Sequence, residues 1–145
     1  MINDFLEVNK IDGKIISFPS VTSVEKVADF VHLSASSIAK AVPFVDEHMD
    51  FFVVVLGMDD SITSKEANLM FKKKDLVPAQ DSEVLSLLAI EKTYFPPIAV
   101  FGAITLVHSS LKEKKRLLFA LSDREFLVVA TSDIEKMNEL EQDEE

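Results

Sequence analysis

The segment from Ile38 to Leu56 constrains the fold of this chain more than any other. Its sequence, IAKAVPFVDEHMDFFVVVL, has two apolar runs, Ala41–Val45 and Phe51–Leu56, separated by the polar stretch Asp46–Asp50. Runs rich in Val and Phe on either side of a short charged loop predict a β-hairpin. Phe51–Leu56 has no polar residue at alternate positions, which predicts a strand that is buried on both faces, at the centre of a covered sheet.

Helices are expected on both sides of this hairpin. Apolar spacing predicts a short helix over Met1–Val8 and a longer one over about residues 23–32, with Thr22 and Glu25 as its capping box. A helical turn over Ser34–Ala39 would lead into the hairpin. After the hairpin, three further helices are expected. Thr63 and Glu66 mark the start of the first, Asp81 the start of the second, and Ser132 and Glu135 the start of the third. Their inward-facing residues would be Ala67, Met70 and Phe71; Val84, Leu87 and Leu88; and Ile134, Met137 and Leu140.

The remaining apolar runs predict strands. Lys14–Phe18 alternates weakly and is expected at a sheet edge, and Pro43 indicates that the first hairpin strand also lies at an edge or contains a bulge. Three later strands are expected at Ala103–His108, Arg116–Ala120 and Phe126–Ala130, the last two joined across Ser122 and Asp123. The predicted fold class is α+β, with a barrel-like mixed β-sheet flanked by helices. Residues 1–145 are expected to form one domain with an acidic tail from about residue 141.

The charge of the chain argues against broad contact with nucleic-acid backbone. The formal net charge is −10, and residues 135–145 hold six acids against one lysine, so both the body and the C-terminal end are acidic. Non-specific binding to DNA depends on clustered lysines and arginines, so DNA is not expected as a partner. Two local basic clusters occur: Lys72–Lys74, and Lys112, Lys114, Lys115 and Arg116. Each could be a helix end that faces water, or it could contact phosphate groups.

Most familiar catalytic sites are missing from the sequence. Gly13, Gly57 and Gly102 are too far apart for a phosphate-binding loop, and no GxSxG or HExxH motif occurs. The three histidines lack metal-ligand spacing and there is no cysteine, so neither a metal nor another cofactor is expected. No apolar run reaches the roughly 20 residues that span a bilayer, and the acidic N-terminus is unlike an export signal. A cytoplasmic protein without a membrane partner is therefore expected.

Lys40 is the main functional candidate that the residues themselves provide. It stands at the entrance to the hairpin, directly after the expected helical turn. An ammonium group beside so apolar a strand must reach solvent, a counter-charge or a ligand, because burying it unpaired is costly. Two interpretations stay open: a structural lysine at a strand end, and a site residue that acts together with the proline-containing loop Tyr94–Gly102.

The order of these segments resembles the YbaK/prolyl-tRNA editing-domain family over about Lys14–Met137. In that family a lysine follows a helix and opens an apolar hairpin, as Lys40 and Ala41 do here. The stretches LGMDDSIT and AQDSEV are similar to two further family segments in the same order. The resemblance implies a barrel-like mixed sheet with surrounding helices.

The resemblance also implies an activity and a site. The activity is hydrolysis, in trans, of the ester that joins a wrong amino acid to tRNA. The implied partners are the 3′ end of mischarged tRNA and an aminoacyl-tRNA synthetase. Lys40 would be catalytic, and the substrate-binding residues would be Ala41, Pro97, Ile98, Phe101, Gly102 and Asp123.

One departure from the family supports an alternative function. Where the family's pocket loop has two glycines, this chain has Pro96 and Pro97, and proline offers no backbone N–H to a substrate oxygen. The alternative is a catalytically degenerate module of the same fold that binds an aminoacyl or nucleotide-like ligand, or a synthetase. An unrelated structural or small-molecule-binding domain is a third interpretation.

Overall fold

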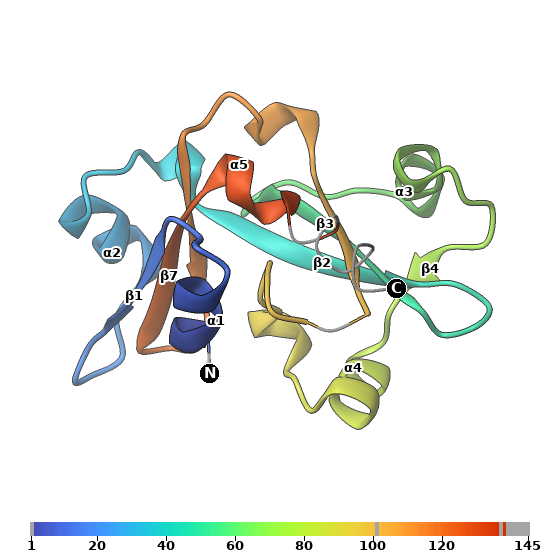
Figure 1. The fold of residues 1–145 in the computed structure, drawn as a ribbon, viewed down its shortest axis with the longest axis horizontal. Coiled ribbons are helices and arrows are strands. Elements are labelled where there is room, and N and C mark those ends of the chain that lie inside the picture. The colour runs from blue at the N-terminus through green and yellow to red at the C-terminus, as the bar shows by residue number, and fades with distance from the viewer. Residues whose placement is uncertain (1, 101, 137, 139–145) are drawn as a thin grey trace.

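A computed structural model describes residues 2–100, 102–136 and 138, and its strands form two sheets (Figure 1). The first sheet has the order β1-β7-β6, with bounds Gly13–Ser17, Glu125–Ala130 and Arg116–Ala120. The second has the order β4-β2-β3-β5, with bounds Val77–Pro78, Ala39–Val45, Phe51–Gly57 and Ile104–Val107. All pairs are antiparallel except β3 with β5, so the expectation of a mixed sheet is confirmed.

Helices cover both sheets. The α-helices are α1 (Ile2–Val8), α2 (Val24–Phe30), α3 (Ser64–Phe71), α4 (Asp81–Leu88) and α5 (Thr131–Ile134). The described residues also form the 3-10 turns η1 (Ala35–Ser37), η2 (Lys92–Tyr94) and η3 (Ser109–Leu111). Figure 1 shows α3 and α4 on opposite sides of the β2–β3 hairpin. The α+β class is therefore confirmed.

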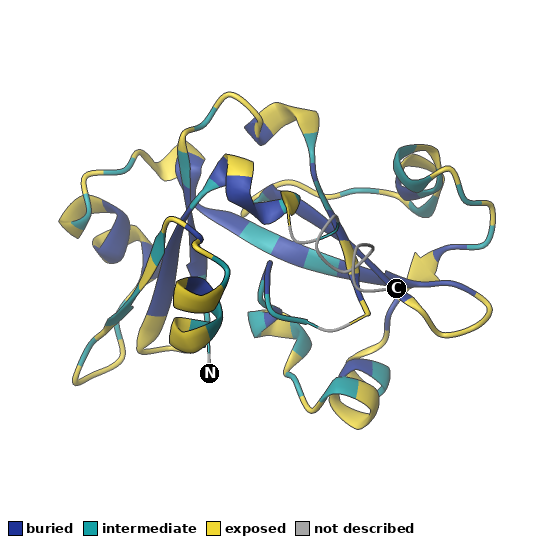
Figure 2. Cartoon of the chain, viewed as in Figure 1, coloured by how far each residue is buried: buried dark blue, intermediate teal, exposed yellow. Residues whose placement is uncertain are grey.

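The hairpin is at the centre of the second sheet, as its sequence predicts. β2 and β3 pair from Ala39↔Gly57 to Val45↔Phe51, and β3 is buried along its length up to Leu56 (Figure 2). One face of β3 packs with Ala67 of α3, and the other packs with Val84 of α4. A strand without polar alternation is thus stable because helices shield both of its faces from water.

In the part of the chain that the structure describes, the sheets do not close into a barrel. Among the described residues, a single isolated bridge between Ile38 and Leu118 links them. On the other side, β4 contributes only two residues, which pair with Phe44 and Val45. The barrel-like part of the prediction therefore corresponds to two sheets that meet at one end of β2, because no strand of the described residues continues the ladder along the rest of that edge.

Local contacts correct several helix predictions. The capping box of Thr63 and Glu66 at α3 is confirmed. At α2 the cap is Ser23, whose side chain accepts a hydrogen bond from the Lys26 N–H, whereas the Thr22 hydroxyl donates to the Ser20 carbonyl. Hydrogen bonds of this kind decide helix starts, and adjacent Thr and Ser residues compete to make them.

The later helices also differ in detail. The N-cap of α4 is Gln80, whose N–H donates to Glu83 at 2.8 Å, so Asp81 is the first residue of the helix. Leu87 is exposed, not inward-facing, because eight residues of helix bury only a narrow stripe around Val84. α5 begins at Thr131, while Met137, Leu140 and the acidic tail lie outside the described residues.

Asp46 anchors the turn of the central hairpin. Its buried carboxylate accepts hydrogen bonds from the backbone N–H groups of Asp50 and His48 and from Lys73 Nζ, at 2.9, 3.0 and 3.1 Å. Burial by itself raises the pKa of Asp46, but the hydrogen bonds from Asp50, Lys73 and His48 outweigh it and the pKa is lowered. Lys73 also lies over the Phe52 ring, which gives one member of the Lys72–Lys74 cluster a structural role.

Replacing Asp46 with asparagine is expected to lower the free energy of unfolding by about 1–2 kcal/mol, because the buried Oδ2 that accepts a hydrogen bond from the partly exposed Lys73 is lost. Because the pKa of Asp46 is lower in the folded state, its carboxylate stabilises the fold at any pH above its unfolded-state pKa of about 4. This stabilisation is lost as the pH falls through the folded-state pKa. Urea unfolding at pH 7 and at pH 3 checks both points. Glu47→Gln, in an exposed pair with His48, is the control, with an expected change under about 0.5 kcal/mol.

Candidate functional site

A cavity of about 390 Å³ lies along the edge of β2, between the two sheets. It is bounded by β2, by the end of β6 and by the η2 turn. Its lining comprises Val24, Ile38, Ala39, Lys40, Ala41, Val42, Pro43, Met58, Asp81, Lys92, Thr93, Phe95, Phe119 and Ala120. The missing continuation of the ladder, described above, is what leaves this space.

The register of β2 determines which backbone groups face the cavity. Met58 N–H donates to the Ile38 carbonyl at 3.0 Å, so even-numbered residues direct their backbone groups towards β3. Ala79 N–H donates to the Pro43 carbonyl at 3.0 Å, so odd-numbered residues direct theirs to the opposite side. Because alternate residues of a strand share this direction, the N–H and C=O of Ala41 point away from β3. β4 does not extend as far as Ala41, so these two groups face the cavity.

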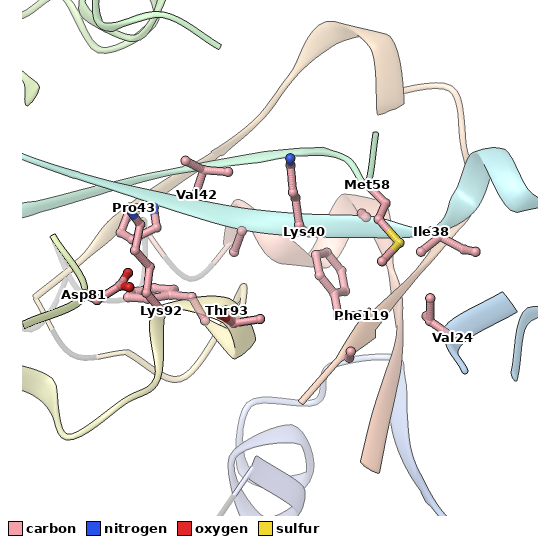
Figure 3. Close-up of a pocket in the computed structure, with 14 residues that line it drawn as sticks. Val24, Ile38, Lys40, Val42, Pro43, Met58, Asp81, Lys92, Thr93 and Phe119 are labelled. Carbon is pink, nitrogen blue, oxygen red and sulfur yellow. The ribbon is translucent and has the colours of Figure 1, made fainter. Parts of the chain in front are cut away.

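The cavity has apolar walls and a charged rim. Ala41, Phe95 and Phe119 are buried and form the apolar part. Lys92 is half-buried and Asp81 is exposed, and Figure 3 shows both beside Pro43 at one end of the lining. Such a site can hold a small apolar group against the rings and bind charged groups at its opening.

Lys40 borders the cavity from the other face of β2. In Figure 3 the side chains of Lys40 and Val42 rise from one side of the strand, while Phe119, Thr93 and Lys92 lie on the other. Strand alternation explains this, because Val42 packs with the α3-side cluster and Ala41 with the Phe95 cluster. Lys40 is half-buried, and no described residue forms an ion pair with it. Its ammonium group is therefore available to an external anion on that face of β2.

The other predicted site residues that the structure describes lie outside the lining of this cavity, apart from Ala41. Pro97 and Ile98 are buried, and Ile98 packs into the core with Val55. Gly102 is exposed with φ +80°, a conformation that favours glycine. Asp123 borders a second cavity with Tyr94 and Pro96, and its carboxylate lies 3.9 Å from Arg124. Phe101 lies outside the described residues. Of the predicted site residues that the structure describes, Lys40 and Ala41 therefore border the same cavity. Pro97, Ile98, Gly102 and Asp123 do not border it.

Sequence reasoning missed several residues of the lining. Lys92 and Thr93 come from the η2 turn and Phe95 follows it directly, in a segment for which the sequence predicts neither a helix nor a strand. Asp81 was expected to cap its helix, and because Gln80 takes the N-cap position its carboxylate is free to line the cavity. No local signal identifies these residues, because only the packing of η2 and α4 against β2 brings them to the site.

The second basic cluster is partly neutralised by acids. Lys112 Nζ lies 3.6 Å from Glu135, and an Arg116 guanidinium nitrogen lies 2.6 Å from Asp12. Lys114 Nζ donates to Ser36 Oγ at 2.6 Å. These contacts favour the structural interpretation of this cluster.

Two further observations bear on cofactors and membranes. The described residues include no group of three His, Asp or Glu side chains that could hold a metal ion. Within the same residues, no helix has the length and hydrophobicity needed to cross a bilayer.

His108 accepts a hydrogen bond from the Ser110 N–H at 3.2 Å and its Nδ1 lies 2.9 Å from Ser110 Oγ, which makes it a cap for η3.

Comparisons with known proteins agree with this fold. Hypothetical protein APE2540, a crystal structure, has a TM-score of 0.77 and 17% identity, with 92% of this chain and 90% of that chain covered. A protein solved as a candidate trans-editing enzyme for prolyl tRNA synthetase has a TM-score of 0.73 and 16% identity, with 92% and 86% covered. The family model described as the aminoacyl-tRNA editing domain matches residues 19–137. The chain therefore belongs to the aminoacyl-tRNA editing domain family, and the resemblance seen in the sequence is confirmed.

Proposed function

We propose that this protein is a trans-acting aminoacyl-tRNA deacylase, which hydrolyses the ester of mischarged tRNA. The observation that carries the proposal is the cavity along the edge of β2, with buried rings at its base, Lys92 at its rim and Lys40 on the other face of the same strand. The aminoacyl end of tRNA has matching parts: a small amino acid, a ribose ester and a flanking phosphate. The family assignment supports the same substrate class.

The reaction requires few catalytic groups from the protein. Water adds to the ester carbonyl carbon, the bond to the ribose oxygen breaks, and a carboxylate, a proton and a free ribose hydroxyl are formed. This ester is already reactive, so placement and electrostatic stabilisation suffice and no nucleophilic side chain is needed. Lys40 would bind the terminal phosphate region as a fixed charge, and the apolar walls would select the amino acid by size, with limited discrimination per methylene.

The partners follow from the reaction. The 3′ end of a mischarged tRNA is the substrate, and an aminoacyl-tRNA synthetase that produces the error is the natural associate. Because tRNA is charged in the cytoplasm, the proposal assigns the protein to that compartment.

A second candidate is a binding module of the same fold without catalysis. Two observations favour it: Pro96 and Pro97 have no N–H to offer, and the Lys40 side chain extends from the opposite face of β2 to Phe119. Such a module would hold charged tRNA or a synthetase without turnover.

A panel of mischarged tRNAs separates the two candidates. Purified protein is incubated with each radiolabelled aminoacyl-tRNA, and the release of amino acid is compared with spontaneous hydrolysis. We expect an acceleration of at least about a hundredfold for one or more small amino acids. Tight binding with no acceleration on any member would establish the binding module, and neither binding nor release would refute both candidates.

A further inference from the structure

We propose that the backbone of Ala41 holds the aminoacyl group of the substrate as a one-residue β-bridge. The proposal rests on the proposed function and adds to it the atoms that bind the reacting group. It assigns the substrate's α-ammonium group to the Ala41 carbonyl and the ester carbonyl to the Ala41 N–H.

The free edge of β2 is the evidence for this binding mode. The N–H and C=O of Ala41 face the cavity, and β4 ends its pairing at Phe44. A strand edge with unpaired groups binds whatever presents the complementary pattern of donor and acceptor. An esterified amino acid has that pattern, because its N–Cα–C=O unit has the same atoms as a strand residue. In an antiparallel bridge the two residues exchange both hydrogen bonds.

The charges along the edge fix the orientation of the ligand. In an antiparallel bridge the ligand nitrogen lies at the carbonyl side of Ala41, which is the side of Pro43. Asp81 lines the cavity at that end, two residues after Ala79, whose N–H bonds Pro43. The carboxylate thus accompanies the α-ammonium group, and the ester and its ribose extend towards Ala39.

The bridge also predicts a stereochemical preference. Side chains of directly paired residues lie on the same face of a sheet. The side chain of an L-amino acid would therefore lie on the Ala41 face, against Phe95, which packs in the same cluster. A D-amino acid bound by the same two hydrogen bonds would direct its side chain to the face of Lys40 and Val42.

The same hydrogen bond would assist the chemistry. When water adds to the ester carbonyl carbon, the carbonyl electron pair moves onto the oxygen bound by the Ala41 N–H. The adduct then expels the ribose oxygen, which takes a proton that came from the attacking water. A donor fixed by the strand is preorganised for this charge, and it can replace donors that Pro96 and Pro97 lack.

Removing the Ala41 N–H tests the bridge. Replacing the Ala41 amide with a backbone ester deletes the donor and leaves the side chain in place. Ala41→Pro deletes it by coded mutation, and the strand already accommodates a proline at Pro43, on the same side. Neither change deletes a donor or acceptor of the ladder with β3, because Ala41 bonds away from it and the Lys40 carbonyl is kept. We expect kcat/KM for an L-alanyl ester of tRNA to fall by about a hundredfold in each.

The control is the same backbone ester at Ala35, an exposed residue that opens η1 and lies outside the cavity. It should leave the rate within about threefold of the unmodified protein, which separates loss of the donor from the effect of an ester bond in the chain. Wild-type protein should also prefer an L-alanyl to a D-alanyl ester by at least about tenfold. An Ala41 ester variant with the unmodified rate, or equal rates for both enantiomers, would overturn the bridge and leave the deacylase assignment intact.

A binding measurement keeps the test independent of turnover. Protein labelled with 15N is titrated with 3′-(L-alanylamino)-3′-deoxyadenosine, which carries an amide in place of the ester. We expect a downfield shift of the Ala41 amide proton that the D-alanyl compound does not produce. If the protein hydrolyses no ester but this shift appears, the deacylase proposal fails and the bridge stands. If the Ala41 resonance does not move with either compound, the bridge is refuted.

Discussion

Replacing Lys40 with alanine is expected to lower kcat/KM for deacylation by about 10- to 100-fold. Lys40 is half-buried on the strand that borders the cavity, and no described residue forms an ion pair with it, so its charge is available to the substrate. A hydrogen bond between charged groups contributes about 1.5–3 kcal/mol, which is about 10- to 100-fold in kcat/KM. A steady-state deacylation assay on the best tRNA of the panel measures the loss, and Lys40→Arg should restore part of it by keeping the charge.

The split between kcat and KM locates the contact. Because the Lys40 side chain lies on the face opposite to Phe119, we expect it to bind the phosphate region and to act mainly through KM. Lys65→Ala, which removes an exposed lysine from α3, controls for the change in net charge and should alter kcat/KM less than about twofold. Full activity in Lys40→Ala would remove this lysine from the mechanism.

Replacing Phe119 with alanine is expected to lower the free energy of unfolding by about 3–5 kcal/mol. Phe119 is 1% exposed and packs with Leu117 and Leu127 of the first sheet while its ring borders the cavity. Its loss should therefore affect both the stability of the fold and the base of the site. Urea unfolding followed by circular dichroism measures the change.

Phe30→Ala is the matched control, since the same atoms are removed from a ring that is 65% exposed and contacts Phe18 edge to face. We expect a loss of about 1 kcal/mol or less there. Similar losses of unfolding free energy in the two variants would mean that Phe119 is not part of the buried core.

The elements that the sequence predicts well are those with strong local determinants. β3 is a continuous apolar run bounded by a charged turn, and its burial follows from that pattern. The capping box of Thr63 and Glu66 identifies α3 because both hydrogen bonds are made within four residues. The family resemblance adds the order of elements, which no local pattern contains.

The site was predictable only in part, because its geometry depends on long-range packing. Lys40 and Ala41 stand out in the sequence, but the direction of each follows from the β2 register, which fixes one side chain on each face. Lys92 and Phe95 reach the cavity from a turn about fifty residues later in the chain. Two of the loop residues implied by the resemblance, Pro97 and Ile98, are buried by the same packing.

The most direct test is a crystal structure of the protein with 3′-(L-alanylamino)-3′-deoxyadenosine. We expect the alanyl group to lie beside Ala41, within hydrogen-bond distance of its N–H and C=O, with the ribose extending along the edge of β2 towards Ala39. Density for the compound at another surface, such as the cavity bordered by Lys112 and Glu135, with the edge of β2 empty, would contradict the assignment of this site.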